Sequence, residues 1–414
     1  MSRLFTLCLL LGAATAFFPI ATQAQNALTL FTDCNCNKTL IKQRLDYVNH
    51  SQDPANAQVY LFITTQFLPQ GGKIFKVDYT GQKDFSGSKL DFELATSSLM
   101  TDAEVDLALT NRIEIGLLGF LAGTPYAKSI KLEIDREAAA NDAEADANPP
   151  KDHWNSWIFE IFSNASFNKE ALRKTTDVRA GLRIERSTPE LRVRVNPFYS
   201  YWSRVFTTSD GEELTSFRKR IYLSTSVVKS ISNHWSVGIF GFGQHHSFNN
   251  IQASYNIAPA IEFNFFDYAE VPFKEFTIAY RIGLVHNDYI QETVFFKESE
   301  SLISHNLNLD LRLRQKWGNV FSGLSARAFQ QDFDKRRLSL NGRCDVRVFK
   351  GLSLNFSGRY ELINDQINLP LGDASLEDIL LGQTQLATNF ETDFRFGLSY
   401  TFGSVFNNTV NTRL

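Results

Sequence analysis

Beyond residue 24 the chain has no run of about 18 apolar residues, the length that a membrane-spanning helix needs. This absence excludes helical membrane spans from the body of the protein. Neither sign of charge dominates, because 42 Lys and Arg stand against 45 Asp and Glu. The chain therefore has no excess of positive charge that would attract nucleic acid, and we expect no nucleic-acid partner.

Cysteine is scarce, with 4 in 414 residues, which excludes a disulfide framework. Cys8 lies in an apolar N-terminal segment, so Cys34, Cys36 and Cys344 remain for the body of the chain. The Cys34-Asn35-Cys36 pair could form a local disulfide, two buried thiols or a redox pair. No His/Cys set with zinc-type spacing accompanies it, and we expect no metal and no cofactor.

Phenylalanine and tyrosine are abundant, with 36 Phe and 13 Tyr against only 2 Met. These aromatic residues favour strands over helices. Mean hydropathy is slightly negative, at −0.20. That value is compatible with a membrane barrel, since only alternate residues of each spanning strand must be apolar.

Residues 1–24 have the pattern of a secretory signal peptide. Arg3 gives the charged start, residues 4–16 give an apolar centre, and Thr22-Gln23-Ala24 gives a small-residue cleavage site. The pattern predicts export.

Residues 25–135 predict a small α/β domain. Its expected strands are 26–34, 57–67, 72–82, 89–96 and 127–135, and its expected helices are 39–48 and 101–122. Thr101 and Glu104 form a capping box for the second helix. The strand at 57–67 is a continuous apolar run, which is typical of a strand covered on both faces. Residues 136–153 are rich in Ala, Asp and Glu, end near Pro149-Pro150 and predict a linker.

From residue 154 to 404 the pattern changes to alternating apolar and polar residues. Twelve such segments lie between Ser156 and Phe402, each about as long as a tilted membrane strand. In 306–314, Leu alternates with Asn, Asp and Arg, and in 394–402 aromatic residues alternate with small or charged ones. Short turns also alternate with longer links, as in outer-membrane barrels. The predicted fold is mainly β: a twelve-stranded antiparallel transmembrane barrel, preceded by the periplasmic α/β domain and followed by a periplasmic tail at 405–414.

The alternation places charged residues on the inner face of the predicted barrel. Those expected to line the lumen are Arg179, Arg192, Arg194, Arg281, Arg312, Arg314, Arg343, Asp345, Arg347, Arg359 and Arg395. They could form an ion-pair network that fills a narrow barrel, since charges inside must be paired or hydrated. They could also form a pore that favours anions.

His245 and Ser247 suggest an alternative, enzymatic function. Two residues apart on one expected strand, they would lie on the face of Trp235, Val237 and Ile239. The His-x-Ser arrangement resembles that of outer-membrane phospholipase and lipid A deacylase, in which His is a general base for a Ser nucleophile. No other motif of those enzymes accompanies it, and we expect that the protein is not an enzyme.

Four segments carry a family resemblance: 53–66 "DPANAQVYLFITTQ", 227–238 "VVKSISNHWSVG", 258–270 "APAIEFNFFDYAE" and 397–408 "GLSYTFGSVFNN". They resemble an uncharacterised family of Gram-negative outer-membrane proteins with a small periplasmic α/β domain before a barrel. The resemblance implies this architecture and no activity. The element order in 25–135 is also similar to the small domain that precedes the propeller in TolB-like proteins.

The sequence therefore predicts a protein of the cell outer membrane with its N-terminal domain in the periplasm. Its expected role is that of a channel, or of a structural or assembly component that links the outer membrane to a periplasmic partner. Expected partners are outer-membrane lipids, the barrel-assembly machinery and a periplasmic protein bound through residues 25–135.

Overall fold

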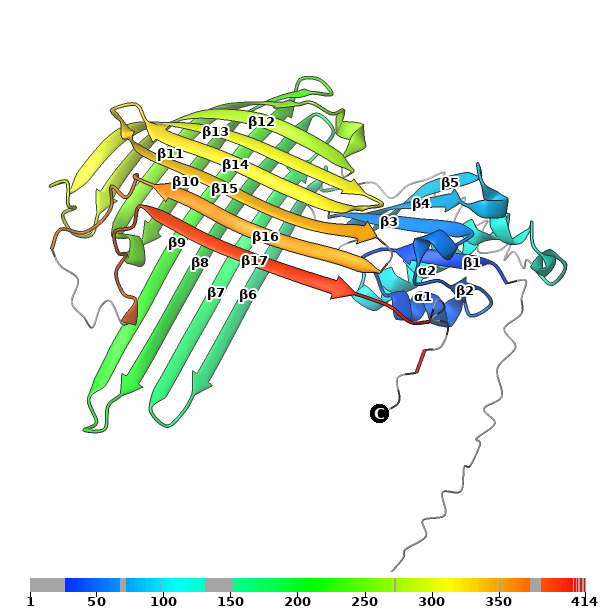
Figure 1. The fold of residues 1–414 in the computed structure, drawn as a ribbon. Coiled ribbons are helices and arrows are strands. Elements are labelled where there is room, and N and C mark those ends of the chain that lie inside the picture. Colours follow the sequence, from blue (N-terminus) through cyan, green and yellow to red (C-terminus); the bar gives the residue numbers. More distant parts are fainter. Residues whose placement is uncertain are drawn as a thin grey trace, which may run out of the picture.

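The computed structural model describes residues 27–67, 72–97, 99–130, 152–271, 273–349, 351–372 and 381–404, with Phe406, Asn408, Val410, Asn411 and Arg413. The predicted signal peptide and most of the predicted linker lie outside these residues. The described chain forms two sheets, one of five strands and one of twelve (Figure 1). Among the described residues, no helix is long and apolar enough to cross a membrane.

The five-stranded sheet belongs to the N-terminal domain and has the order β2-β1-β3-β4-β5. Its strands are β1 Thr29–Asp33, β2 Asn49–His50, β3 Val59–Phe67, β4 Lys73–Gly81 and β5 Lys89–Thr96. Its helices are α1 Lys38–Arg44 and α2 Asp102–Leu121, with short 3-10 turns at Pro54–Asn56, Lys83–Phe85 and Pro125–Lys128. Strands β1, β2 and β3 run parallel, and β4 and β5 are antiparallel additions.

Helix α2 begins where the sequence predicts it, because Thr101 and Glu104 form the reciprocal capping box. Its buried residues include the predicted face of Val105, Leu109 and Ile113. This face packs with α1 on one side of the sheet, against Leu61 and Val77 among others, and forms the main core of the domain. Burial of this contiguous apolar cluster is the main stabilising term of the domain.

The predictions for this domain are wrong in two places. Residues 127–130, expected to begin a strand, lie in and after the 3-10 turn that Pro125 opens. Proline at the start of such a turn has its φ angle preset and no N–H to place in a sheet. Helix α1 is also shorter than expected, since Val48 already precedes the short strand β2.

The twelve-stranded sheet is antiparallel throughout and follows chain order from β6 to β17. Its strands are β6 Trp157–Lys169, β7 Arg173–Ser187, β8 Leu191–Thr207, β9 Glu213–Ser230, β10 Trp235–His246, β11 Ile251–Asn264, β12 Lys274–Tyr289, β13 Ser299–Gln315, β14 Gly318–Phe329, β15 Asp332–Phe349, β16 Leu352–Ile363 and β17 Phe390–Tyr400. The prediction of twelve strands is confirmed. Two 3-10 turns, Ser247–Asn249 and Tyr268–Glu270, lie between strands.

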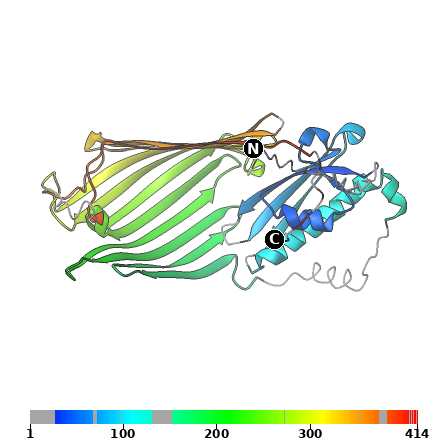
Figure 2. The same ribbon diagram turned by 60° about the horizontal axis from the view of Figure 1, so that its bottom comes forward.

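The sheet is curved but open. In the described strands β6 and β17 are its two edges and do not pair with each other. Figure 2 shows these edges on opposite sides of a trough. The predicted closure into a barrel is therefore absent from this structure.

The strands are longer than the predicted membrane-length segments, reaching 18 residues in β9 and β15. The strands include residues that the sequence predicts to be in loops. As a result, only residues 170–172 connect β6 and β7. The predicted sorting of short and long links holds only in part. The long links that remain at the end away from the N-terminal domain are 290–298 and 364–389.

Candidate functional site: the arginine face and the docked domain

The register divides the twelve-stranded sheet into two chemically different faces. One row of paired residues across β17 to β12 reads Arg395, Ser357, Arg343, Phe321, Arg312 and Glu275. The next row, on the opposite face, reads Phe396, Phe356, Cys344, Val320 and Leu313. Because side chains alternate along each strand, these rows define an arginine face and an apolar face.

The apolar face is exposed. Phe394, Phe396 and Leu398 of the last strand are 63%, 70% and 61% exposed. Aromatic rings gather near the short turns, where Trp235 packs on Phe263 at 4.7 Å and Phe265 on Phe276 at 4.6 Å between ring centroids. An exposed apolar face of this extent needs a covering environment.

All the residues predicted to line a lumen lie on the arginine face. The register places there Arg179, Arg192, Arg194, Arg281, Arg312, Arg314, Arg343, Asp345, Arg347, Arg359 and Arg395. That this face encloses a lumen stays a prediction, since the sheet is open.

Most of these arginines are held by carboxylates of the same face. The pairs, with their N···O distances, are Arg179–Asp177 at 2.7 Å, Arg192–Glu185 at 2.7 Å, Arg312–Glu275 at 2.9 Å, Arg343–Asp345 at 2.9 Å and Arg395–Asp393 at 3.0 Å. Others stack on rings: Arg281 lies 3.9 Å from the centroid of Phe240. Ion pairs and flat stacking fix the guanidinium groups in place.

Two buried carboxylates each serve two arginines. Glu185 lies 2.7 Å from Arg192 and 3.8 Å from Arg194, and its side chain is 3% exposed. Asp365 lies 2.8 Å from Arg337 and 3.8 Å from Arg327. The cluster around Glu185 therefore holds more positive than negative charge, which makes it able to attract an anion. Around Asp365 the charges balance, because Glu361 also lies 3.5 Å from Arg337.

The N-terminal domain docks on the short-turn end of the arginine face. Asp33, at the end of β1, lies 3.3 Å from Arg347 of β15 and accepts a hydrogen bond from the hydroxyl of Tyr60. Arg347 also donates to the carbonyl oxygen of Lys316, in the turn between β13 and β14, at 3.2 Å. Burial and the bond to Asp33 raise the pKa of Tyr60, so its hydroxyl remains a donor at neutral pH.

Lysines and aromatic rings widen this contact. Lys316 donates to Thr80 at 2.7 Å and lies over the ring of Tyr60. Phe62 packs on Phe273, 6.4 Å between centroids, and Lys76 donates to the carbonyl oxygen of Val271 at 3.4 Å. Tyr60 and Phe62 point away from the helices. Strand β3 is thus covered by helices on one face and by the large sheet on the other, as its apolar run predicts.

The C-terminal tail returns to the same domain. Phe406 forms an antiparallel bridge with Ser51, and Asn408 accepts from the backbone N–H of His50 at 2.7 Å. Asn408 also donates to the side chain of Asn49 at 2.9 Å. The tail thus covers the edge strand β2, whose unpaired backbone groups would otherwise be open.

The expected placement of His245 and Ser247 on one face of a single strand is wrong. Strand β10 ends at His246, and Ser247 opens a 3-10 turn. Ser247 accepts from the backbone N–H of Lys219 at 2.9 Å, while His245 bonds to the carbonyl oxygen of Gln252 at 3.0 Å. The strand period therefore does not carry the two side chains to one face.

Cys34 and Cys36 form a disulfide, one of the alternatives that the sequence leaves open, and Cys344 is free. Within the part of the chain that the structure describes, no group of three or more His, Cys, Asp and Glu side chains could hold a metal ion.

Comparisons with known proteins give structural neighbours only. No protein-family model and no curated protein matches the chain. Among solved structures, the NanC porin is similar at 9% identity over 59% of this chain and 99% of its own, with a TM-score of 0.28. The translocator domain of the autotransporter NalP from Neisseria meningitidis is similar at 12% identity over 65% and 95%, with a TM-score of 0.25. Similarity this low establishes no shared function.

Proposed function

We propose that the chain is an outer-membrane protein whose twelve strands cross the membrane as a closed barrel. The observation that carries this proposal is the separation of faces, with exposed apolar residues on one face of the sheet and charged residues, most of the arginines among them paired, on the other. Lipid would cover the apolar face, and the aromatic rings near the short turns suit a membrane interface. Water would meet only the arginine face.

The strand number allows the sheet to close into a barrel. An even number of antiparallel strands leaves β6 and β17 running in opposite directions, so the two edges can pair with each other. In lipid an open edge leaves backbone groups without partners, at a cost of several kcal/mol each. The membrane therefore favours the closed form over the trough.

The proposed role is structural: the barrel holds the N-terminal domain against its periplasmic end. The docking of Asp33 and Tyr60 on Arg347 and Lys316 supports this role, as does the tail on β2. A periplasmic protein would bind the free side of the domain, where Leu107 and Ile115 of α2 are exposed. We propose no enzymatic role.

Fractionation and heat-modifiable migration test this proposal. The expected result is recovery in the outer membrane, with faster migration of the unboiled sample, because a closed barrel resists detergent unfolding. Recovery in the soluble fraction with one mobility would contradict it.

An anion channel is the second candidate, favoured by the excess of positive charge where Glu185 alone serves Arg192 and Arg194. An open lumen would give anion-selective steps in a planar bilayer, and Arg312→Ala with Arg347→Ala would shift the reversal potential toward cations. If the protein inserts into the bilayer and shows no conductance, the channel proposal is contradicted and the structural role remains.

A further inference from the structure

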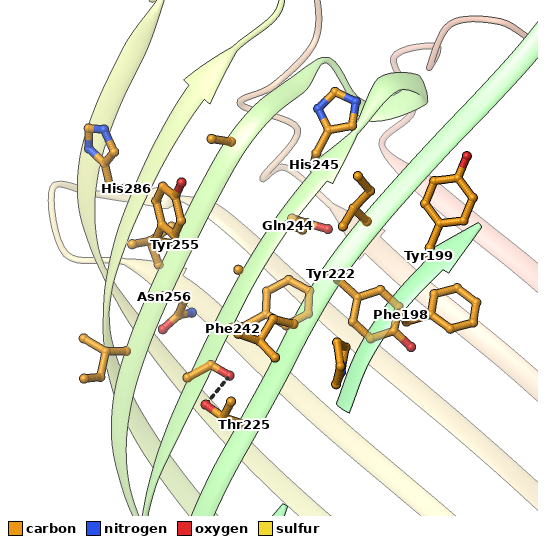
Figure 3. Close-up of a pocket in the computed structure, with 18 of the residues that line it drawn as sticks. Phe198, Tyr199, Tyr222, Thr225, Phe242, Gln244, His245, Tyr255, Asn256 and His286 are labelled. Carbon is orange, nitrogen blue, oxygen red and sulfur yellow. Dashed lines mark hydrogen bonds between the residues drawn. The ribbon is translucent and has the colours of Figure 1, made fainter. Parts of the chain in front are cut away.

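A groove of about 1300 Å³ lies on the apolar face across β6 to β13. Its lining is mainly apolar, and its volume exceeds the usual 300–1,000 Å³ of small-ligand pockets. Figure 3 shows the groove with Thr225 toward one end and with His245 and His286 toward the other.

Small residues on neighbouring strands make the floor. The register brings Pro197, Gly243 and Gly241 to the apolar face beside Thr225. The larger side chains around them are exposed: Ile257 is 55% and Leu284 61% exposed.

A ladder of aromatic rings lies behind the floor, on the arginine face. Phe198 and Tyr222 stack at 4.9 Å between centroids, and Tyr222 and Phe242 at 6.0 Å (Figure 3). Glycine weakens a strand, and stacked rings on neighbouring strands compensate for it. The floor is therefore supported from behind and stays open on the apolar side.

The far end of the groove is polar because the β10–β11 register shifts beside His245. His245 Nδ1 lies 3.0 Å from the carbonyl oxygen of Gln252, and His286 Nδ1 lies 2.8 Å from Ser301 Oγ. A carbonyl oxygen only accepts, so Nδ1 of His245 carries the proton and Nε2 is left for a ligand. Lys219 lies on the same face, one row from His245.

We propose that this groove binds an acyl chain of a phosphorylated glycolipid of the outer leaflet, of the lipid A class. The proposal rests on the proposed function, since the groove is continuous with the face that lipid would cover. Its polar end lies at the rim away from the docked domain, which is the outer leaflet if that domain is periplasmic. The ammonium of Lys219 complements a phosphate there, and the unprotonated Nε2 of His245 accepts a hydrogen bond from a hydroxyl group of the glycolipid.

Gly243 allows a sharp test. A Cβ there would meet Tyr255 at 3.6 Å, an ordinary contact, so Gly243→Leu fills the groove without moving the backbone. Gly342→Leu is the matched control: Gly342 lies on the apolar face of β15, away from the groove, and a Cβ there meets only Phe321 O at 3.6 Å. Ile257→Trp obstructs the groove by a second route.

The experiment extracts full-length protein from outer membranes in mild detergent and measures lipid A and phospholipid per protein by native mass spectrometry. We expect retained lipid A in wild type and Gly342→Leu, and at least a fivefold loss in Gly243→Leu and Ile257→Trp. Lys219→Ala should reduce the preference for phosphorylated over dephosphorylated lipid A.

Equal lipid A in all heat-modifiable variants would overturn the inference and leave the proposed function intact. Loss of phospholipid alone would overturn the assigned occupant. Recovery of the wild type in the soluble fraction would overturn the proposed function and the inference with it.

Discussion

Asp33 of the N-terminal domain and Arg347 of strand β15 form an ion pair at 3.3 Å, although 314 positions separate them in the chain. The carboxylate also accepts from Tyr60, and the guanidinium also donates to the Lys316 carbonyl. One partly buried pair therefore connects β1 and β3 with strand β15 and with the turn between β13 and β14.

A double-mutant cycle on Asp33→Asn and Arg347→Met should give a coupling energy of about 1 kcal/mol. This value is at the upper end of the coupling energies of exposed ion pairs, because both side chains are about three-quarters buried. The measurement is the urea unfolding transition of the N-terminal domain within the full-length protein. The matched control pair, Arg395–Asp393, is exposed and remote, and it should leave this transition unchanged. Additive effects at Asp33 and Arg347 would show that the pair does not hold the domain.

Two glycines of α2 predict opposite effects of the same substitution. A Cβ at Gly116 would lie 2.7 Å from the hydroxyl of Tyr79, which is buried and bonded to the carbonyl oxygen of Ile113. Gly116→Ala should therefore destabilise the domain by about 1–3 kcal/mol. Nothing lies within 4 Å of a Cβ at Gly119, so Gly119→Ala should stabilise it by roughly 0.5–1 kcal/mol. Thermal unfolding measures both, and shifts of equal sign would contradict the packing.

His50 predicts a loss of domain stability in acid. Burial lowers its pKa, against the opposing effect of the Leu45 carbonyl, which accepts from the ring at 2.9 Å. The unfolded state therefore binds the proton of His50 more readily than the folded state does. The contribution of neutral His50 to the stability of the domain is complete above a pH of about 6.5, and it declines as the pH falls toward the lowered pKa. The melting temperature of the domain should fall between pH 7 and 5, and less so in His50→Gln. An identical pH dependence in both proteins would exclude His50 as the cause.

The alternating faces could be predicted from the sequence because side-chain direction in a strand depends only on parity. Arg312 and Arg314 lie on one face of β13 for this reason, whatever the neighbouring strands do, whereas Arg312, Arg343 and Arg395 share a face through the register of β13 to β17. The capping box of α2 could be predicted too, since its two residues are three apart. Where a strand ends is less local: β17 stops at Tyr400, two residues before the predicted limit at Phe402.

Features that depend on distant segments could not be predicted. No sequence pattern near Asp33 or Arg347 predicts their contact. The apolar run of β3 predicts that both faces of this strand are covered, but it does not identify the segment that covers the second face. The two-residue strand β2 forms because it pairs with β1, and the tail bridges at Phe406 because Ser51 lies beside it. The pairing of His245 with Ser247 fails for the same reason, since the register shift beside His245 arises from the partner strand.

The central claim is that lipid covers the apolar face and water the arginine face. Spin labels on single cysteines at residues 393–400, in a Cys344→Ser background reconstituted in liposomes, test it most directly. We predict that collision with oxygen, which concentrates in lipid, peaks at Phe394, Phe396, Leu398 and Tyr400, and that a water-soluble nickel complex peaks at Arg395 and Ser399. High exposure of all these positions to the nickel complex, without alternation, would contradict the account.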